Sequence, residues 1–360
     1  MDPIIYQSDS GLILRYGQKR ILIDPNGKKY DEQIDLILVS HAHSDHVAGL
    51  PYVYKKGIPI IMSPITHKIL QKLGYRLYPS DIILLKPNEN INIKGIEITA
   101  RNAGHIMGSI MFEIDLGKLR IGYTGDFNFE DTLVTQKADL LDADVVIIDA
   151  TYGHPMYSFP PRDMLYRLIR EKLRESIREG KTPVLYGYAL GKSQELTKLA
   201  QDFVGGVISV DVNVALYNRL YEETTKRSLG RYYASPMGDV LIRSMRKKSG
   251  RKGKLPYYDE LYFTGWIASD WGLNKGFPLS SHNSFVRLIE YISKICPDKV
   301  IALYNFKHVF ANIVQQELEI PSEPISSSPI TINIRIRVSK DGRNYMLDPY
   351  LSGENDYGPI

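Results

Sequence analysis

The sequence predicts an α/β fold with a parallel α/β unit in its middle, and three observations lead to this prediction. Over roughly the first 142 residues, short apolar runs that end in a polar residue follow one another, as strands of a buried sheet do. From "ADVVIIDATYG" onward, strand and helix patterns alternate, which favours a parallel sheet. After about residue 278, a pattern like the first one returns.

The first part contains β-type runs separated by turns, with a helix among them. The runs are "GLILRYG", "KRILIDP", "DLILVSH", "IPIIMS", "INIKGIEITA", "SIMFEIDLG" and "LRIGYTGD". The stretch "PITHKILQKLG" has proline at its start and glycine at its end, and this predicts a helix over residues 64–74.

The middle part opens with a long helix, predicted over residues 161–180. Leu165, Ile169 and Leu173 repeat at helical spacing, and Gly180 supplies the stop. A strand in "TPVLYGY", a helix in "LGKSQELTKLAQDF" and a strand in "GGVISV" follow. The last part is predicted to hold a helix ending near Cys296, a strand in "KVIALYN", a helix from Val309 and the hairpin-like "ITINIRIRVSKDGRNYML".

The composition is that of a globular chain with an adequate core. Of the 360 residues, 43% are hydrophobic and 24% are charged, which suits one large or two interleaved domains. No apolar stretch approaches the roughly 20 residues of a membrane helix, and the start has no signal-peptide pattern, so we expect a cytoplasmic protein without a membrane partner.

Cys296 is the only cysteine, so a metal site must use histidine and carboxylate ligands. It shares a predicted helical face with Leu288 and Ile292, and we expect it to be a buried core thiol.

The stretch "VSHAHSDHVAGL" places three of the eight histidines directly after a β-type run. His41 and His43 are two residues apart and point to the same side if the chain is extended there. Asp45 and His46 follow as the chain turns toward a helix. Imidazole nitrogens and a carboxylate at this spacing suit two adjacent divalent ions, and sites with such ligands accept zinc, manganese or iron. The sequence therefore predicts a metal-dependent hydrolase centre.

The pattern HxHxDH after a buried strand resembles the signature of the metallo-β-lactamase superfamily, and three further residues match its motifs in order. These are Asp24 in "ILIDP", His105 in "NAGHIMGS" and Asp126 in "YTGDF". The resemblance implies an αββα sandwich in which Asp24 supports the metal loop and Asp126 bridges two ions. It also implies zinc, as one or two ions, with manganese or another divalent metal as the alternative. It implies two ligand sets: His41, His43, His105 and Asp126 on one ion, and Asp45, His46 and Asp126 on the other.

Asp149 in "IIDATYG" begins a second resemblance, to the β-CASP nucleases and most closely to their DNA cross-link repair branch, which includes Artemis. The segments that carry it are "HPMYSFPPRDML", "YALGKSQEL", "YFTGWIASD" and "FPLSSHNSF". The resemblance implies an α/β β-CASP domain over residues 156–277, inserted into a discontinuous metallo-β-lactamase domain of residues 1–155 and 278–360.

The same resemblance makes His282 a member of the site. Its ring would give a proton to the leaving oxygen, and Asp149 would orient the ring and favour its charged form. Asp45, Asp126, Asp149 and His282 are thus the expected catalytic residues. The alternative for His282 is a turn histidine that is hydrogen-bonded among Ser280, Ser281 and Ser284.

Two segments are candidates for nucleic-acid contacts. Residues 243–254, "RSMRKKSGRKGK", hold seven cations and no acid, which suits a phosphate backbone, although a solvated loop is the alternative. The expected contacts there are Arg246, Lys247, Lys248, Arg251 and Lys252. Gly191, Lys192 and Ser193 open a predicted helix, whose N–H groups and dipole favour a phosphate.

One departure from the family pattern bears on the substrate. Many β-CASP ribonucleases have a further histidine in an "HGE" segment, whereas this chain has Tyr304 and Asn305 in "VIALYNFKHVF". This favours the cross-link repair branch and leaves the second ion short of a ligand. His308 would reach the site only if the loop shifted, and His154 has no assigned role.

We therefore expect a metal-dependent nuclease, with DNA end processing or repair and a single-stranded or 5′-end preference favoured. The alternative is an RNA-processing β-CASP endonuclease or 5′ exonuclease. A nucleic-acid-binding scaffold without catalysis is the third hypothesis.

Overall fold

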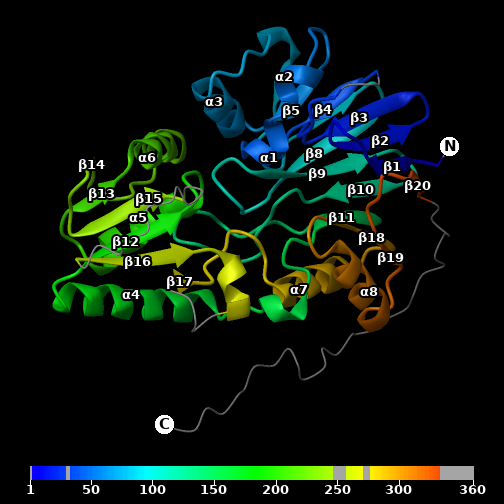
Figure 1. Ribbon diagram of the computed structural model, residues 1–360. Coiled ribbons are helices and arrows are strands. Elements are labelled where there is room, and N and C mark those ends of the chain that lie inside the picture. The colour runs from blue at the N-terminus through cyan, green and yellow to red at the C-terminus, as the bar shows by residue number, and fades with distance from the viewer. Residues whose placement is uncertain (1, 30–32, 246–256, 271–275, 333–360) are drawn as a thin grey trace.

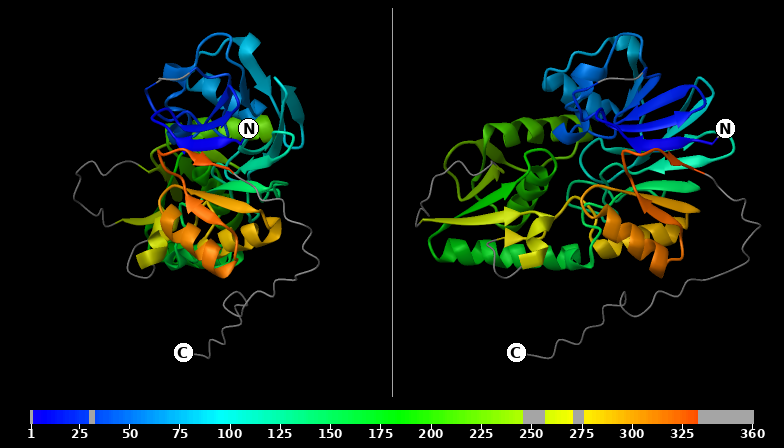
Figure 2. Two further views of the ribbon diagram at one scale, coloured as in Figure 1. Left: turned by 90° about the vertical axis from the view of Figure 1, so that its right-hand side faces the viewer. Right: turned by 45° about the vertical axis from the view of Figure 1, so that its right-hand side comes forward.

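The computed structural model describes residues 2–29, 33–245, 257–270 and 276–332 of the chain. Two seven-stranded sheets face each other, and a six-stranded sheet lies beside them with its own helices (Figure 1). The layers follow one another from the helices of the first third of the chain, coloured blue, to those near residue 300, coloured orange (Figure 2).

The first sheet has the strand order β20-β1-β2-β3-β4-β5-β6. Its strands are β1 Ile4–Gln7, β2 Leu12–Tyr16, β3 Lys19–Ile23, β4 Leu36–Leu38, β5 Ile60–Met62, β6 Ile82–Leu84 and β20 Ile330–Thr331. On its outer face lie α1 Ser44–Val47, α2 Leu50–Val53, α3 Pro64–Lys72 and the short η1 Pro79–Asp81. Successive residues of β2 alternate between the faces: Leu12 and Leu14 pack toward the second sheet and Ile13 toward the helices.

The second sheet has the order β19-β18-β11-β10-β9-β8-β7. Its strands are β7 Asn90–Ile93, β8 Ile96–Asn102, β9 Ile110–Asp115, β10 Arg120–Tyr123, β11 Val145–Asp149, β18 Lys299–Leu303 and β19 Ser322–Pro324. Val145 and Ile147 of β11 fill the core between the sheets, while Val146 and Ile148 pack on the other side with α7 Phe285–Ile295 and α8 Lys307–Glu317. The predicted αββα sandwich is confirmed.

The third sheet forms between β11 and α7 and is parallel throughout, with the order β14-β13-β15-β12-β16-β17. Its strands are β12 Thr182–Gly187, β13 Ile208–Val210, β14 Tyr232–Ala234, β15 Val240–Ser244, β16 Tyr258–Phe263 and β17 Gly276–Phe277. Its helices are α4 Arg162–Arg178, α5 Lys192–Phe203 and α6 Val212–Thr225, with η2 Pro155–Tyr157 and η3 Gly265–Asp270. Because β11 pairs in parallel with β18, this α/β insertion leaves and rejoins the sandwich between neighbouring strands.

Three local predictions need correction. Cys296 is exposed, because α7 ends at Ile295 and Cys296 adopts the left-handed conformation of the helix cap, with φ 51°. The run "INIKGIEITA" is two strands, since Lys94 and Gly95 turn the chain with φ 53° and 76°. The last helix begins at Lys307, two residues before the predicted start.

Two predicted features lie wholly or largely outside the described residues. These are the basic contacts Arg246, Lys247, Lys248, Arg251 and Lys252, and the hairpin-like segment beyond Ile332. In the described part of the chain, the longest helix is α4, at 17 residues, and no helix is both long and apolar enough to cross a membrane.

Candidate metal centre

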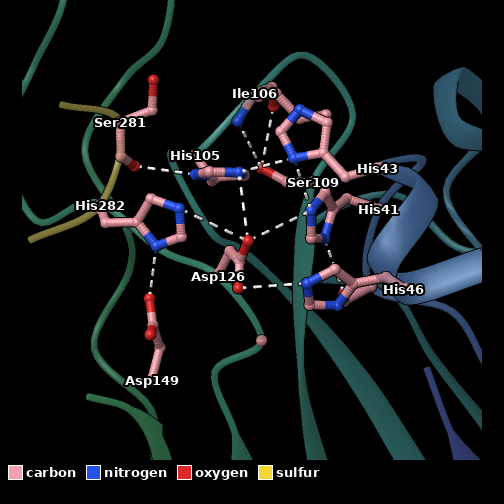
Figure 3. Close-up of polar contacts among 12 residues, drawn as sticks. His41, His43, His46, His105, Ile106, Ser109, Asp126, Asp149, Ser281 and His282 are labelled. Atoms are coloured by element: carbon pink, nitrogen blue, oxygen red, sulfur yellow. Dashed lines mark hydrogen bonds and ion pairs between the residues drawn. The ribbon is translucent and has the colours of Figure 1, made fainter. Parts of the chain in front are cut away.

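The predicted site residues meet where the strand ends of the sandwich face the insertion. They come from separate elements (Figure 3): His41 and His43 follow β4, His46 lies in α1, His105 follows β8, Asp126 follows β10, Asp149 ends β11, and His282 follows β17. Of these strands, β10 and β11 are parallel neighbours, and β4 pairs in parallel with β3, which ends just before Asp24, so their carboxyl ends bring distant residues to one edge. The structure thus assembles seven residues that are spread over more than 240 positions of the sequence.

His43 and His105 each use one ring nitrogen to hold a backbone carbonyl. His43 donates from Nε2 to the oxygen of Leu190 at 3.1 Å, and His105 donates from Nδ1 to the oxygen of Ser281 at 2.8 Å. A carbonyl only accepts, so these nitrogens carry the protons and the opposite nitrogens keep their lone pairs. The Leu190 carbonyl belongs to the insertion and the Ser281 carbonyl to the segment between β17 and α7, and the two carbonyls orient the two rings.

Asp24 sets the orientation of His41 and His46 from behind. Its carboxylate accepts hydrogen bonds from the Ser40 hydroxyl at 2.6 Å, from Nδ1 of His46 at 2.8 Å and from the Tyr123 hydroxyl at 2.7 Å. Because the Ser40 hydroxyl donates to Asp24, His41 must donate from Nδ1 to that hydroxyl, at 2.9 Å. Nε2 of both rings is left to face the cleft, and this is the supporting geometry expected of Asp24.

The free nitrogens converge on one point. Nδ1 of His43 lies 3.0 Å from Nε2 of His41 and 3.1 Å from Nε2 of His105, and Oδ2 of Asp126 lies 3.5 Å from the Nε2 atoms of both His41 and His105. Burial lowers the pKa of all three rings, which favours the neutral form that binds metals. Unprotonated nitrogens this close repel one another unless a cation lies between them. These four residues therefore fit a divalent ion with nitrogen and oxygen ligands.

Asp126 faces two directions. While Oδ2 points at the first ligand set, Oδ1 lies 3.3 Å from Nε2 of His46, which is the arrangement expected of a bridging carboxylate. Asp45 is exposed on the cavity wall and belongs to none of the donor groups found among the described residues. The reason is local: Asp45 and His46 are consecutive in α1, so their side chains point about 100° apart.

His282 and Asp149 form a close pair. Nδ1 of His282 donates to Oδ2 of Asp149 at 2.7 Å, and Nε2 lies 3.6 Å from Oδ2 of Asp126. Burial lowers the pKa of His282, but the charges of Asp126 and Asp149 outweigh it and raise the pKa to about 9. The Ser280 hydroxyl accepts the backbone N–H of His282, at 2.9 Å, whereas the Asp149 carboxylate meets the ring itself, so the expected carboxylate orients the ring.

A cavity of about 630 Å³ opens over these residues, between the sandwich and the insertion. The insertion contributes Tyr188, Tyr217 and Trp266 to its wall, which the sequence had not identified. Tyr304 also lines the cavity, in the place of the missing histidine, with a positive φ of 69° and its ring 6.0 Å from that of His46. His308 is exposed on α8, and Nδ1 of His154 accepts the N–H of Met156.

The predicted phosphate site at the start of α5 is occupied by internal bonds. The N–H of Gly191 donates to Oε1 of Gln194 at 2.6 Å, and the N–H of Ser193 donates to the oxygen of Tyr188 at 3.0 Å. Nζ of Lys192 is buried 2.5 Å from Glu195. These contacts speak against the expected phosphate contact, because a phosphate would have to displace them.

Arg162, which the sequence did not single out, ties this helix to the site. Its guanidinium contacts Glu195 at 2.5 Å, Glu130 of the sandwich at 3.1 Å and the backbone oxygen of Ser280 at 2.6 Å. Tyr166 donates to the same oxygen of Glu195 at 2.5 Å. The group of Glu130, Arg162, Tyr166, Lys192 and Glu195 is called the interdomain cluster below.

Comparison with known proteins places this geometry in a family. Residues 3–171 match the model of the beta-lactamase superfamily domain. A probable DNA ligase of Opitutus terrae is 27% identical over 290 residues, which are 77% of this chain and 27% of that protein. Endoribonuclease YSH1 of Candida albicans is 27% identical over 240 residues, 53% of this chain and 27% of the relative.

An RNase J-like protein of Methanocaldococcus jannaschii is 30% identical over 189 residues, 48% of this chain and 45% of the relative. The chain thus spans less than half the length of each of these relatives. The matched domain, the sandwich with its α/β insertion and the order of the site motifs agree with one another. Residues 3–171 therefore carry a beta-lactamase superfamily domain, and the α/β insertion that follows agrees with the predicted resemblance to the β-CASP group.

Proposed function

We propose that this chain is a metal-dependent nuclease that hydrolyses phosphodiester bonds of RNA. The observation that carries the proposal is the convergence of unprotonated ring nitrogens with Asp126 in an open cavity, next to a histidine that is protonated at neutral pH. The RNA substrate is supported by two relatives whose names describe an endoribonuclease and an RNase J-like protein.

His41, His43, His105 and Asp126 would hold the first divalent ion, with His46 and the other oxygen of Asp126 available to a second. Zinc suits this ligand set, and manganese or iron would also be accepted. Bound ions would activate water as the nucleophile and offset charge on the phosphoryl oxygens.

The proton for the leaving oxygen would come from His282. With its pKa raised to about 9, the ring carries a proton at pH 7, and its Nε2 faces the same oxygen of Asp126 that meets the ligand set. Asp149 holds Nδ1 and thereby keeps Nε2 directed at the cleft. Asp45, exposed on the cavity wall, remains in the proposal as a candidate second ligand that would have to rotate inward.

The sequence favoured DNA as the substrate. The relatives that are named as ribonucleases do not support this preference, and the RNA-processing alternative fits them better. DNA stays as the second candidate because the relative with the longest match among those compared above, over 77% of this chain, is a probable DNA ligase. End polarity and a cytoplasmic location remain predictions from the sequence.

The test is a cleavage time course on single-stranded RNA and DNA of one sequence, each labelled at the 5′ or the 3′ end. The zinc-loaded protein is expected to cleave RNA faster, and Asp126→Ala is expected to cleave neither strand. Faster cleavage of DNA would reverse the order of the two candidates. If the loaded protein cleaves neither strand, the nuclease proposal is wrong.

A further inference from the structure

A second groove on the sandwich continues from the catalytic cavity. It has a volume of about 540 Å³ and lies along the segment that follows α3. Leu73 and Tyr75 line both this groove and the cavity, so the two hollows share a rim. The groove formed by Lys56, Leu73, Tyr75, Arg76 and Tyr78 is called the α3 groove below.

The helix α3, which precedes the groove in the chain, lies on the side of the sandwich that faces the insertion (Figure 1). Lys68 of α3 forms an ion pair with Glu223 of α6 at 2.9 Å, which places the two elements side by side above the cavity. A polymer longer than the cavity has to leave it over some part of the rim. The shared residues Leu73 and Tyr75 mark one such exit.

The charge of the α3 groove suits a phosphate backbone. Lys56 and Arg76 are both exposed along it. Asp81, whose charge acts on that of Lys56, is buried, and it accepts the Tyr54 hydroxyl at 2.6 Å and the N–H of Gly57 at 2.8 Å. Because both cations are exposed and the carboxylate of Asp81 is buried, an anionic strand in the groove can meet Lys56 and Arg76.

An aromatic surface accompanies the two cations. Tyr78 is 50% exposed, and Nζ of Lys56 lies 5.1 Å from the centre of its ring. In a single-stranded nucleic acid, a base can stack on an aromatic ring while a neighbouring phosphate contacts a cation. A folded duplex does not offer unstacked bases to such a ring, so the combination favours a single strand.

We propose that the α3 groove binds the part of a single-stranded nucleic acid that extends out of the catalytic cavity, with Lys56 and Arg76 on its phosphates and Tyr78 on a base. The inference rests on the proposed nuclease function and adds the path of the substrate. It predicts that contacts in the α3 groove matter for long strands and much less for strands that fit inside the cavity.

The test measures binding of a labelled 20-nucleotide single-stranded RNA and of a tetranucleotide to Asp126→Ala protein, which does not consume them. Adding Lys56→Gln and Arg76→Gln is expected to weaken binding of the 20-mer at least tenfold. The slope of log K against log salt should become shallower by about 1.4, since each lost phosphate contact on a single strand accounts for about 0.7. Tyr78→Ala is expected to weaken the 20-mer at least fivefold without changing the slope.

The matched control is Arg174→Gln with Arg178→Gln, a pair of exposed arginines on α4 that line neither hollow. An affinity and a slope equal to those of the control would overturn the inference. An equal loss for the tetranucleotide would also overturn it, because the contacts would then belong to the cavity. Cleavage of RNA by the unmodified protein, measured alongside, separates failure of this inference from failure of the nuclease proposal.

Discussion

The metal centre and the interdomain cluster are both buried and polar, and they lie on either side of the loop that carries Ser280 and His282. In the metal centre, ring nitrogens face one another at 3.0 and 3.1 Å without a proton between them. In the interdomain cluster, each cation meets an anion: Arg162 and Lys192 both contact Glu195 at 2.5 Å.

This difference in how the buried charges and lone pairs are matched indicates a structural role for the interdomain cluster and a metal-binding role for the other site. A buried group whose charges are already matched needs nothing from outside, and removing one member leaves a buried charge uncompensated. A group whose lone pairs converge without a partner becomes more stable when a cation enters, so its folding and its ligand binding are linked. The same distinction explains why the buried lysine at the start of α5 is not expected to act as a phosphate contact.

The largest expected effect is that of Asp126→Ala on the metal centre. Changes to groups behind metal ligands typically cost 10–100-fold in metal affinity, so loss of an oxygen that faces the ligands should cost more than about 100-fold and abolish cleavage. Zinc titration and the cleavage assay measure both. The control is Asp142→Ala, an exposed partner of Arg120, and equal zinc affinity in the two variants would contradict the assigned centre.

The next effect concerns the interdomain cluster. Arg162→Met leaves Glu195 and Glu130 without their shared cation, and we expect the free energy of unfolding to fall by about 3–5 kcal/mol. Arg167→Met, in an exposed pair with Asp163, should change it by less than about 0.5 kcal/mol. Denaturant titration of the zinc-loaded proteins gives both numbers, and similar values for the two variants would show that the cluster is not structural.

A pH effect of up to ~3 kcal/mol is expected from His282 in the metal-free protein. Its pKa is raised from 6.5 to about 9 by folding, so protonation stabilises the native state. This contribution is fully present below pH 6.5 and is lost as the pH rises through 9. His46 also has a raised pKa and acts in the same direction, so the comparison with His282→Gln isolates the His282 part.

The measurement is denaturant titration of both proteins at pH 6, 7.5 and 9 with a chelator present. The stability difference between the wild type and His282→Gln should shrink across this range. A difference that does not change with pH would mean that the ring is neutral in the fold.

The smallest effect on RNA binding is expected for the substitution Lys192→Met. The side chain is buried against Glu195, so its loss should lower the free energy of unfolding by about 1–3 kcal/mol. RNA affinity should stay within about twofold and the salt slope should not change. If the slope of log K against log salt became shallower by about 0.7, Lys192 would make the phosphate contact that the sequence predicted.

Much of the centre was predictable because its motifs are local and each follows a strand. The spacing of His41, His43 and His46, together with the family resemblance that picked out Asp126, identified residues that the structure brings together. The sandwich and its α/β insertion followed from the alternation of apolar runs and from the family resemblance. Cys296 was misplaced because periodicity does not show where a helix ends.

What the sequence alone determined is therefore the set of candidate ligands and the order of strands and helices, since both depend on neighbours along the chain. The tertiary structure decided which nitrogen of each ring is free. The carbonyls of Leu190 and Ser281 fix two of the rings from positions 147 and 176 residues away. It also turned Asp45 outward, paired Lys192 with Glu195, and joined the catalytic cavity to the α3 groove. These outcomes depend on contacts between segments that only folding brings together, because hydrogen bonds and burial act through space.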